Sequence, residues 1–395
     1  MMNILFLTPF PIIPYAGGVQ RVTDILTEGF VRKGYGVTYL CYDSNGNVVH
    51  DSVSFRQRFI ELSGKNDKII NDELCKICGE NEITHVIVQV CDKYTNRIVS
   101  LMPLYLRNRV IYSCHIIPFS SDSITRRRIW DTDAKNLRQL LFKVVSLVFP
   151  FVYKAFFNTI EKDALREGFR LATKFCFISE KYYDNVLRHM PDAPLQKFIA
   201  INNPNTYGVQ YLLPDAKHRE NSVLWVGRVA NAQKNAYGFI RMWQIFSKSH
   251  PQWTAYFVGE GEDLPFIKKY VARNNIQNIS FEGKQQDVMT YYKRCKYLCV
   301  TSFGESWGMI ITEAMSCGCV PIVMDTFPTL TDIVDDGKNG IICNASPKDM
   351  AGRMNSVIDD SDLWRSMSAN AVNKVKEFDV ERILPKWECL LDSLK

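Results

Sequence analysis

Short apolar runs, rich in β-branched and aromatic residues, alternate with amphipathic stretches along the whole chain. In the first half these runs predict strands at Asn3–Thr8, Gly36–Cys41, His85–Val90, Arg109–Ser113 and Lys174–Ile178. Stretches with helical periodicity separate them, among them Gln20–Lys33 and Glu180–Arg188. Strands that alternate with amphipathic helices are typical of a parallel sheet covered by helices on both faces.

The same alternation resumes in the second half. Strands are predicted there at Ser222–Val226, Thr254–Val258, Ile279–Glu282, Tyr297–Thr301, Val320–Met324 and Gly340–Ile342. Between the two series, Asn202–Glu220 contains Asn-Asn-Pro-Asn and Pro-Asp, which favour turns and linkers. The sequence therefore predicts an α/β protein with two doubly wound, Rossmann-like domains, residues 1–205 and 206–379, that face each other across a cleft. Ligands bind beyond the carboxyl ends of the strands in such folds.

The composition is that of a globular protein. Of 395 residues 46% are apolar and 23% charged, which excludes disordered, coiled-coil and collagen-like chains. No apolar stretch reaches about 18 residues, and Pro9, Pro11 and Pro14 interrupt the apolar start, so neither a transmembrane helix nor a signal peptide is expected. The twelve cysteines are scattered, which indicates buried free thiols in a reducing cytoplasm. The pair Cys75-x-x-Cys78 has no second pair at zinc-site spacing, so a metal or redox site is not expected there.

The net positive charge is confined to the first half. The chain has 48 Lys and Arg against 42 Asp and Glu, and this net charge of +6 is too small to indicate a nucleic-acid partner. All of the excess lies in residues 1–205, concentrated in Arg126–Lys154, where seven basic and two acidic residues are interleaved with an apolar, aromatic run that extends to Phe157. Such a segment, 126–157, suits an anionic membrane surface or a lipid-diphosphate acceptor. The alternative is a core helix with solvated lysines, interrupted at Pro150.

Two glycine-containing turns follow predicted strands. After the first strand, Gly17-Gly18 precedes a helix, where the backbone can approach a phosphate closely, or where the glycines merely form the turn. After Ser222–Val226 come Gly227-Arg228 and then Lys234, just before the helical run Ala236–Phe246. Two cations above a strand end are suited to a diphosphate, although most Lys and Arg residues are only surface charges.

Paired glutamates form the most specific feature of the chain. The predicted strand Tyr297–Thr301 ends in a glycine-containing loop with Glu305, and a helix then begins near Gly308, carries Glu313 and ends around Cys317-Gly318. The backbone amides of Gly308, Met309 and Ile310, at the positive end of this helix, would face phosphates. The alternative places Glu305 and Glu313 in solvent as a loop charge and a helix charge.

Together these residues resemble a known family. The motifs are similar to those of retaining glycosyltransferases of family 4, which have the GT-B fold: Gly17-Gly18, Gly227-Arg228 with Lys234, Val258-Gly259-Glu260-Gly261 and Glu305-x7-Glu313. The resemblance covers nearly the whole chain and is strongest over 222–345. It implies two Rossmann-like domains, a metal-independent reaction, and a last helix, within about 380–395, that packs back on the first domain.

The resemblance also implies roles for single residues. Arg228 and Lys234 would neutralise the leaving nucleoside diphosphate, Glu305 would contact hydroxyls of the transferred sugar, and Glu313 would contact the ribose. In addition, Gly17 and Gly18 would lie beside the diphosphate, Gly283 near the base, and His115 near the reacting sugar.

The implied function is that of a retaining hexosyltransferase. It would move a hexose from a UDP- or GDP-sugar to a glycan or lipid-linked glycan, in cell-surface polysaccharide biosynthesis, by front-face substitution. No cofactor, metal or nucleic acid is expected, and the expected location is the cytoplasm, at the periphery of the inner membrane. Asp131-Thr-Asp133, which resembles a metal-binding string of another fold, is better explained as helix capping. The alternative function is a non-catalytic or epimerase-type GT-B protein that binds nucleotide sugars.

Overall fold

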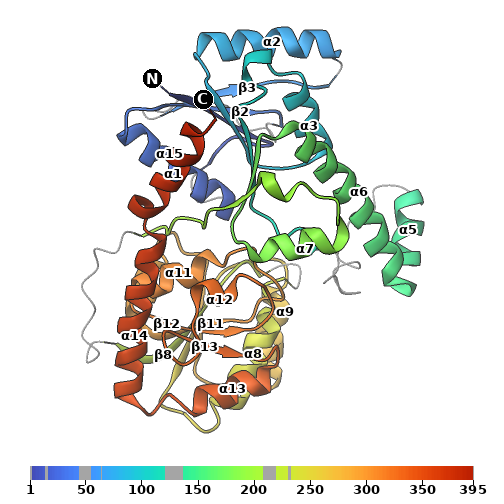
Figure 1. The fold of residues 1–395 in the computed structure, drawn as a ribbon. Helices are drawn as coiled ribbons and strands as arrows, with labels where there is room; N and C mark the ends of the chain where they lie inside the picture. Colours follow the sequence, from blue (N-terminus) through green and yellow to red (C-terminus); the bar gives the residue numbers. More distant parts are fainter. Residues whose placement is uncertain are drawn as a thin grey trace. The chain divides into compact units, whose positions relative to one another are not determined.

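The computed structural model describes residues 2–13, 17–43, 55–63, 65–120, 137–207, 219–229 and 233–394. These residues form two compact units (Figure 1). The C-terminal unit is Asn205–Asp379, and the N-terminal unit comprises the described residues up to Pro204 together with the last helix, from Val380 onward. Each unit is built around a parallel sheet with helices on both faces, so the predicted α/β class with two Rossmann-like domains is confirmed.

Seven parallel strands form the sheet of the N-terminal unit, in the order β3-β2-β1-β4-β5-β6-β7. Their bounds are β1 Asn3–Thr8, β2 Gly36–Cys41, β3 Arg56–Phe59, β4 His85–Val88, β5 Val110–Cys114, β6 Lys174–Phe177 and β7 Phe198–Ala200. The central strands are buried along nearly their whole length, as their unbroken apolar runs require. Two edge strands, β3 and β7, were not predicted from the sequence, and they are short and only partly buried.

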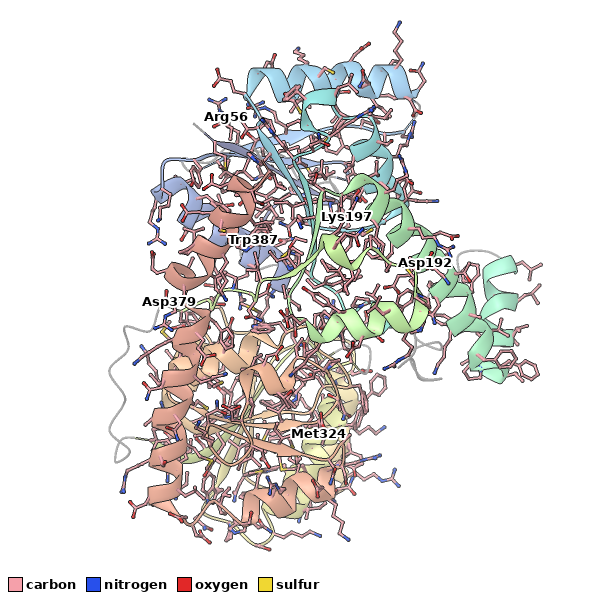
Figure 2. All side chains as sticks on the ribbon, in the orientation of Figure 1. Arg56, Asp192, Lys197, Met324, Asp379 and Trp387 are labelled. Atoms are coloured by element: carbon pink, nitrogen blue, oxygen red, sulfur yellow. The ribbon has the colours of Figure 1, made fainter. Side chains whose placement is uncertain are left out.

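Helices cover both faces of this sheet. The helices of this unit are α1 Gly18–Arg32, α2 Asp67–Glu80, α3 Lys93–Ser100, α5 Leu137–Val148, α6 Pro150–Leu171, α7 Lys181–His189 and α15 Val380–Asp392. Helix α1 packs against α15, and α3 packs against α6. Right-handed crossovers place the α1 layer and the α3–α6 layer on opposite faces, because the strand order reverses between β1 and β4. Lys197, labelled in Figure 2, caps the C-terminus of α6 by donating to the carbonyls of Phe169 and Ala172, at 2.8 and 2.6 Å.

The last helix, α15, belongs to the N-terminal unit. Its Glu388 accepts a hydrogen bond from the hydroxyl of Tyr35 at 3.0 Å, and Glu381 pairs with Arg32 of α1. Trp387, also labelled in Figure 2, is only 3% exposed. Helix α15 therefore joins the core beneath α1, as the family resemblance implies.

Helices α5 and α6 form a hairpin with an exposed apolar surface. Pro150 is the first residue of α6, so it begins a helix there and does not only interrupt one. Figure 1 shows α5 at the outer edge of the N-terminal unit, beside the first turns of α6. The exposed side chains of this apolar patch are Leu137, Leu140, Leu141, Val144, Val145, Val148, Phe149, Phe151, Phe156 and Ile160. The interpretation of this segment as a core helix is therefore wrong for α5, whereas Asp131 and Asp133 lie outside the described residues.

Six parallel strands form the sheet of the C-terminal unit, in the order β10-β9-β8-β11-β12-β13. Their bounds are β8 Glu220–Val226, β9 Thr254–Val258, β10 Ile279–Gly283, β11 Cys295–Val300, β12 Val320–Met324 and β13 Ile341–Cys343. The helices are α8 Ala236–Phe246, α9 Leu264–Arg273, α10 Met289–Arg294, α11 Met309–Ser316, α12 Leu330–Ile333, α13 Pro347–Asn355 and α14 Ser361–Val375. Helices α8 and α13 pack together on one face, and α10, α11 and α14 on the other. The predicted strands agree with these to within two residues at each end.

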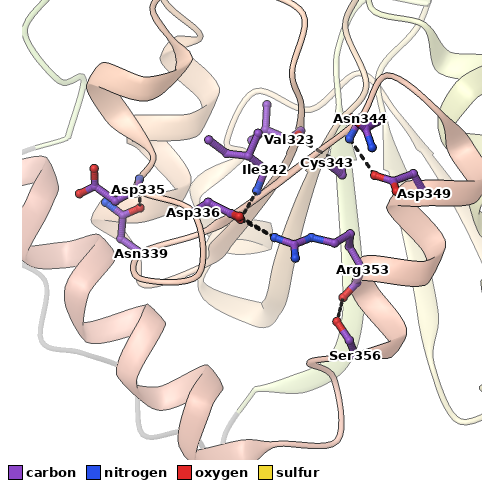
Figure 3. Close-up of polar contacts among 10 residues, drawn as sticks. All are labelled: Val323, Asp335, Asp336, Asn339, Ile342, Cys343, Asn344, Asp349, Arg353 and Ser356. Carbon is purple, nitrogen blue, oxygen red and sulfur yellow. Dashed lines mark hydrogen bonds and ion pairs between the residues drawn. The ribbon is translucent and has the colours of Figure 1, made fainter.

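Side chains fix the edge strand β13. Asp336 accepts hydrogen bonds from the Ile342 amide at 2.8 Å and from the Arg353 guanidinium at 2.6 Å (Figure 3). Asp349 of α13 accepts from the Asn344 amide at 2.7 Å. These contacts satisfy backbone groups at the sheet edge and lock α13 beside β13.

Three findings bear on metals, thiols and membranes. None of the described helices is long and apolar enough to cross a membrane. The twelve cysteines are free thiols, with Cys75 exposed and Cys78 buried. Among the described residues, no three His, Cys, Asp or Glu side chains are grouped as metal ligands.

Candidate functional site

The candidate site of the C-terminal unit lies where the strand order reverses. Strands β8 and β11 are neighbours at the centre of the sheet, and the chain leaves them toward opposite directions of the sheet order. Gly227-Arg228 follows β8, and the loop with Glu305 follows β11. Since both strands are parallel, both loops lie at the same carboxyl edge, which is the usual position of a ligand crevice in this class of fold.

Backbone hydrogen bonds join the loops after β8, β9 and β10. The Gly227 amide donates to the Val258 carbonyl at 3.1 Å, and the Gly259 amide donates to the Gly283 carbonyl at 2.8 Å. Gly259 has a φ of +148°, and a Cβ there would lie 1.9 Å from the carbonyl oxygen of Gly227. Glycine is therefore required at this close approach, which brings the predicted residues Gly227 and Gly283 into one continuous layer of loops.

Lys234 and Glu305 form an ion pair at this edge. The Lys234 ammonium lies 2.5 Å from Oε1 of Glu305, and the Ser302 hydroxyl donates to the same oxygen at 2.6 Å. The Glu305 side chain is 10% exposed and that of Lys234 27%. The interpretation of Glu305 as a solvated loop charge is therefore wrong.

The backbone around Lys234 is held by the loop that follows β11. The Thr301 hydroxyl lies 3.1 and 2.9 Å from the carbonyls of Lys234 and Asn235, and the Phe303 amide donates to Gln233 at 2.8 Å. Asn235 caps α8 through its side chain, in a left-handed conformation with a φ of +49°. These contacts fix the backbone from which the Lys234 side chain extends.

Arg228 is the second cation of the site. It is exposed, and it makes no hydrogen bond or ion pair with any other described residue of the chain. A guanidinium has five N–H donors in a planar fork that matches phosphate oxygens. Arg228 is therefore free to bind an anion that approaches this edge.

Helix α11 begins beside Glu305. Gly308 is its N-cap, with a φ of +86°, and Met309 and Ile310 are the first helical residues, both half-buried. The amides of a first helical turn have no partner within the helix, and the positive end of the helix dipole lies there. The first-turn amides of α11 therefore follow Glu305 closely in the chain, and anion binding by them stays a prediction.

Glu313 points inward from the second turn of α11. Its side chain is buried, and its two oxygens accept hydrogen bonds from the Thr206 hydroxyl at 2.8 Å and the Tyr292 hydroxyl at 3.1 Å. The interpretation of Glu313 as a solvated helix residue is therefore wrong. Neither Thr206 nor Tyr292 stood out in the sequence, because no local pattern connects them with Glu313.

The remaining predicted residues lie in the N-terminal unit. Gly17 and Gly18 are exposed at the start of α1, after β1, where the expected helix begins two residues earlier than predicted. At the carboxyl end of neighbouring β4, Gln89 is buried, and its Oε1 has no hydrogen-bond partner among the described residues. The strand order reverses between β1 and β4, so Gln89 lies at a second crevice position. A polar residue at the end of an apolar run was the signal that sequence reasoning missed.

His115 follows β5 and is buried. The Ser113 hydroxyl lies 3.0 Å from its Nε2. Burial lowers the pKa of His115 to about 4, opposed by a hydrogen bond with Asn203. The imidazole is therefore neutral at pH 7, and it can donate or accept a hydrogen bond but carries no charge.

A cavity of about 950 Å³ lies in the N-terminal unit, and Ile116, the residue after His115, contributes to its lining. Ile116 lines one end, and Tyr153, Phe157 and Ile160 of α6 form an apolar wall. The lining also includes polar residues of α3, among them Asn96. The cavity therefore offers aromatic and hydrogen-bonding surface together, beside the loop that carries His115.

The sequence comparisons identify the C-terminal unit most clearly. Residues 214–374 match the family model described as glycosyl transferases group 1. An uncharacterized glycosyltransferase of Haemophilus influenzae is 22% identical over 95% of this chain and 96% of its own length. A Campylobacter jejuni enzyme, an α-1,4-N-acetyl-D-galactosaminyltransferase acting on a diphosphoundecaprenol-linked glycan, is 21% identical over 49% of this chain and 54% of its own length.

The structural comparisons agree on the fold. Anabaena HepE in complex with UDP-glucose matches with a TM-score of 0.71 at 16% identity, over 100% of both chains. TarM matches with a TM-score of 0.73 at 11% identity, over 99% of both chains. The fold class expected from the resemblance is therefore confirmed, whereas the finer assignment to family 4 stays a prediction.

Proposed function

We propose that this chain, whose residues 214–374 match the family model of glycosyl transferases group 1, transfers a hexose from a UDP- or GDP-sugar to a glycan or lipid-linked glycan with retention of configuration. One observation carries the proposal most directly. The Lys234–Glu305 ion pair, the unpaired Arg228 and the N-terminus of α11 lie at the strand-order reversal of one sheet. Cations, free amides and a buried carboxylate together suit an anionic diphosphate that is linked to a polyhydroxyl sugar.

The donor diphosphate is bound by the two cations. The ammonium of Lys234 has three N–H groups, of which Glu305 uses one, so the others are available for phosphate oxygens. Arg228 binds the same diphosphate through its fork, and the amides of Gly308, Met309 and Ile310 add uncharged donors.

The two glutamates contact different parts of the donor, one the sugar and the other the nucleoside. Glu305 accepts hydrogen bonds from hydroxyls of the transferred hexose, and the carboxylate of Glu313 accepts from the ribose. Gly283, in the bonded layer of loops after β10, lies beside the base. The complex of HepE with UDP-glucose supports a uridine nucleotide as the first donor to test.

The transfer step is a front-face substitution. An acceptor hydroxyl attacks C1 of the hexose, the C1–O bond to the diphosphate breaks on the same side, and the acceptor proton passes to the departing phosphate oxygen. Lys234 and Arg228 stabilise the charge that develops on the diphosphate. The neutral imidazole of His115 offers a hydrogen bond and no charge, and the protein acts through position and electrostatics in this proposal. Neither a metal nor a cofactor is required in this proposal.

The acceptor occupies the N-terminal unit. The cavity beside Ile116 combines an aromatic wall with hydrogen-bonding groups, which is the kind of surface that glycans contact. The apolar patch of α5 and α6 rests on an anionic membrane: residues 137–160 contain Arg138, Lys143 and Lys154 but no Asp or Glu. This arrangement suits a lipid-linked glycan in cell-surface polysaccharide biosynthesis, with the enzyme on the cytoplasmic face.

A thermal-shift screen tests the donor half of the proposal. A ligand that binds only the folded state raises the melting temperature with its concentration. At least one of UDP-glucose, UDP-galactose, UDP-N-acetylglucosamine and GDP-mannose should raise it, and free glucose should not. A protein that none of these nucleotide sugars stabilises at millimolar concentration would not have the proposed donor site.

A further inference from the structure

The carboxylate of Glu313 is held by two hydroxyl groups from distant parts of the C-terminal unit. The Thr206 hydroxyl donates to Oε1 at 2.8 Å and the Tyr292 hydroxyl to Oε2 at 3.1 Å. Glu313 is 2% exposed, so its carboxylate does not rotate freely in solvent. Each carboxylate oxygen has two lone pairs, so a carboxylate can accept up to about four hydrogen bonds, more than the two that Thr206 and Tyr292 donate.

Tyr292 is suited to hold the carboxylate permanently. Its ring, on α10, is completely buried. Burial, with the neighbouring Glu313 charge, raises the pKa of Tyr292 well above its ordinary value of 10. The phenol therefore stays protonated across the physiological pH range and remains a donor.

Thr206 is held on a segment that is itself tied to α11. The neighbouring Asn205 donates from its side chain to the Ser316 hydroxyl, one helical turn beyond Glu313. The Asn205 amide also donates to the Phe378 carbonyl at 2.7 Å. The contact with α11 and the contact with Phe378 therefore hold the segment that carries Thr206, at the first residues of the C-terminal unit.

We propose that Thr206 and Tyr292 are positioning residues for the nucleotide ribose. They orient the Glu313 carboxylate so that its remaining lone pairs meet the 2′ and 3′ hydroxyls of the nucleoside diphosphate. Loss of either hydroxyl would leave the carboxylate present but wrongly oriented. The inference rests on the proposed function, because it takes the ribose to be the ligand of Glu313.

The test is a mutant cycle read by nucleotide affinity. Isothermal titration with UDP, or with GDP if only the guanosine donor stabilises the protein, is made on the full chain and on Thr206→Val, Thr206→Ser, Tyr292→Phe and Glu313→Gln. Thr206→Val and Tyr292→Phe should each weaken binding about tenfold, the loss of one good hydrogen bond. Thr206→Ser keeps the hydroxyl and should bind within about twofold of the wild type.

Two comparisons separate positioning from a general structural role. If both residues act through Glu313, Thr206→Val combined with Glu313→Gln should bind no more weakly than Glu313→Gln alone. The 2′,3′-dideoxy nucleotide should bind the wild type and Thr206→Val equally. The inference would be overturned if the losses of affinity from Thr206→Val and Glu313→Gln added in the double variant. It would also be overturned if Thr206→Val weakened binding of the dideoxy nucleotide as much as binding of the normal nucleotide.

The failure of the inference differs from the failure of the proposed function. A wild type that binds neither UDP nor GDP overturns both. A wild type that binds, with Glu313→Gln weakened and Thr206→Val and Tyr292→Phe unchanged, overturns only the positioning role. Thr206 is half-buried, so Thr206→Val is expected to fold even where Tyr292→Phe does not.

Discussion

The ammonium of Lys234 lies 2.5 Å from Oε1 of Glu305, although 71 positions separate the two residues in the chain. The pair joins the loop before α8 to the loop after β11, the two connections that flank the centre of the sheet. Both side chains are less than one-third exposed, so water alone does not fully hydrate either charge. Each charge is therefore stabilised by the other. The pair therefore stabilises the fold locally while it holds a cation and a carboxylate ready at the same edge.

Replacing Lys234 should remove activity and cost some stability. Lys234→Met leaves Glu305 with the Ser302 hydroxyl but without its cation, which should lower the free energy of unfolding by on the order of 1–3 kcal/mol. Release of nucleoside diphosphate from the donor should fall at least 100-fold, because stabilisation of the leaving group is lost. Urea unfolding and a coupled release assay measure the two effects. Lys248→Met, on an exposed lysine of the same unit, is the matched control and should change neither.

Arg228 should act on the diphosphate alone. Since Arg228 has no partner among the described residues, Arg228→Gln should leave the melting temperature unchanged. The affinity of the Arg228→Gln variant for UDP should be about tenfold lower than that of the wild type. Its affinity for uridine, which has no phosphate, should not change. Titration calorimetry measures both affinities, with Arg241→Gln, at an exposed residue of α8, as the control. An equal loss for UDP and uridine would show that Arg228 does not contact the diphosphate.

Stability should depend on pH through His115. The pKa of the unfolded histidine is about 6.5, and burial lowers that of the folded one to about 4. Between these values the unfolded state binds more protons, so the free energy of unfolding falls as the pH drops from 6.5 toward 4. At pH 5 the free energy of unfolding is lower by about 2 kcal/mol than at neutral pH because of His115. Urea unfolding of the wild type and of His115→Asn at pH 7.5 and pH 5 should show a smaller fall in the variant, and identical falls would refute the assignment.

The close approach at Gly259 should tolerate no side chain. A Cβ would lie 1.9 Å from the Gly227 carbonyl oxygen, so Gly259→Ala should lower the free energy of unfolding by about 2 kcal/mol or more and weaken donor binding. Gly352, on the exposed side of α13, has open space around its Cα, so Gly352→Ala should be neutral or stabilising by up to about 1 kcal/mol. Thermal melts compare the two. A Gly259→Ala protein as stable as Gly352→Ala would contradict the described loop packing.

The apolar patch should direct binding to anionic membranes. Leu140 and Val144 are exposed one turn apart on α5, so the double change Leu140→Glu and Val144→Glu puts two charges on the face assigned to the membrane. Sedimentation with phosphatidylglycerol vesicles should fall at least tenfold at low salt. Phe266→Glu, on an exposed residue of the C-terminal unit, should sediment as the wild type does. Wild-type protein that stays in the supernatant would refute membrane docking.

The sequence predicted the strands that are buried on both faces. Runs such as Thr254–Val258 and Val320–Met324 have few polar residues, and their bounds agree with β9 and β12. By contrast, β3 is Arg-Gln-Arg-Phe and lies at the sheet edge, where one side faces solvent and no apolar run is needed. Strand β7 has three residues, too few for a periodic pattern to be recognised.

The sequence could predict only one part of the candidate site, namely the residues that follow parallel strands and therefore lie at the same edge of the sheet. Arg228, Lys234 and Glu305 follow neighbouring parallel strands, so their proximity could be argued from topology. The hydroxyls of Thr206 and Tyr292 reach Glu313 through tertiary packing between a linker, α10 and α11, for which no spacing rule exists. The apolar, small-residue segment around Glu313 is consistent with its burial, but that segment does not reveal which hydroxyl groups contact the carboxylate.

The anomeric configuration of the released sugar tests the central claim most directly. Proton NMR of the wild type with the donor that stabilises it most should show nucleoside diphosphate and a sugar whose first anomer has the configuration of the donor, before mutarotation. Glu305→Ala should release neither, although its melting temperature still indicates a folded protein. A first product of inverted configuration, or no release from any nucleotide sugar that binds, would contradict retaining transfer at the site formed by Lys234, Glu305 and Arg228.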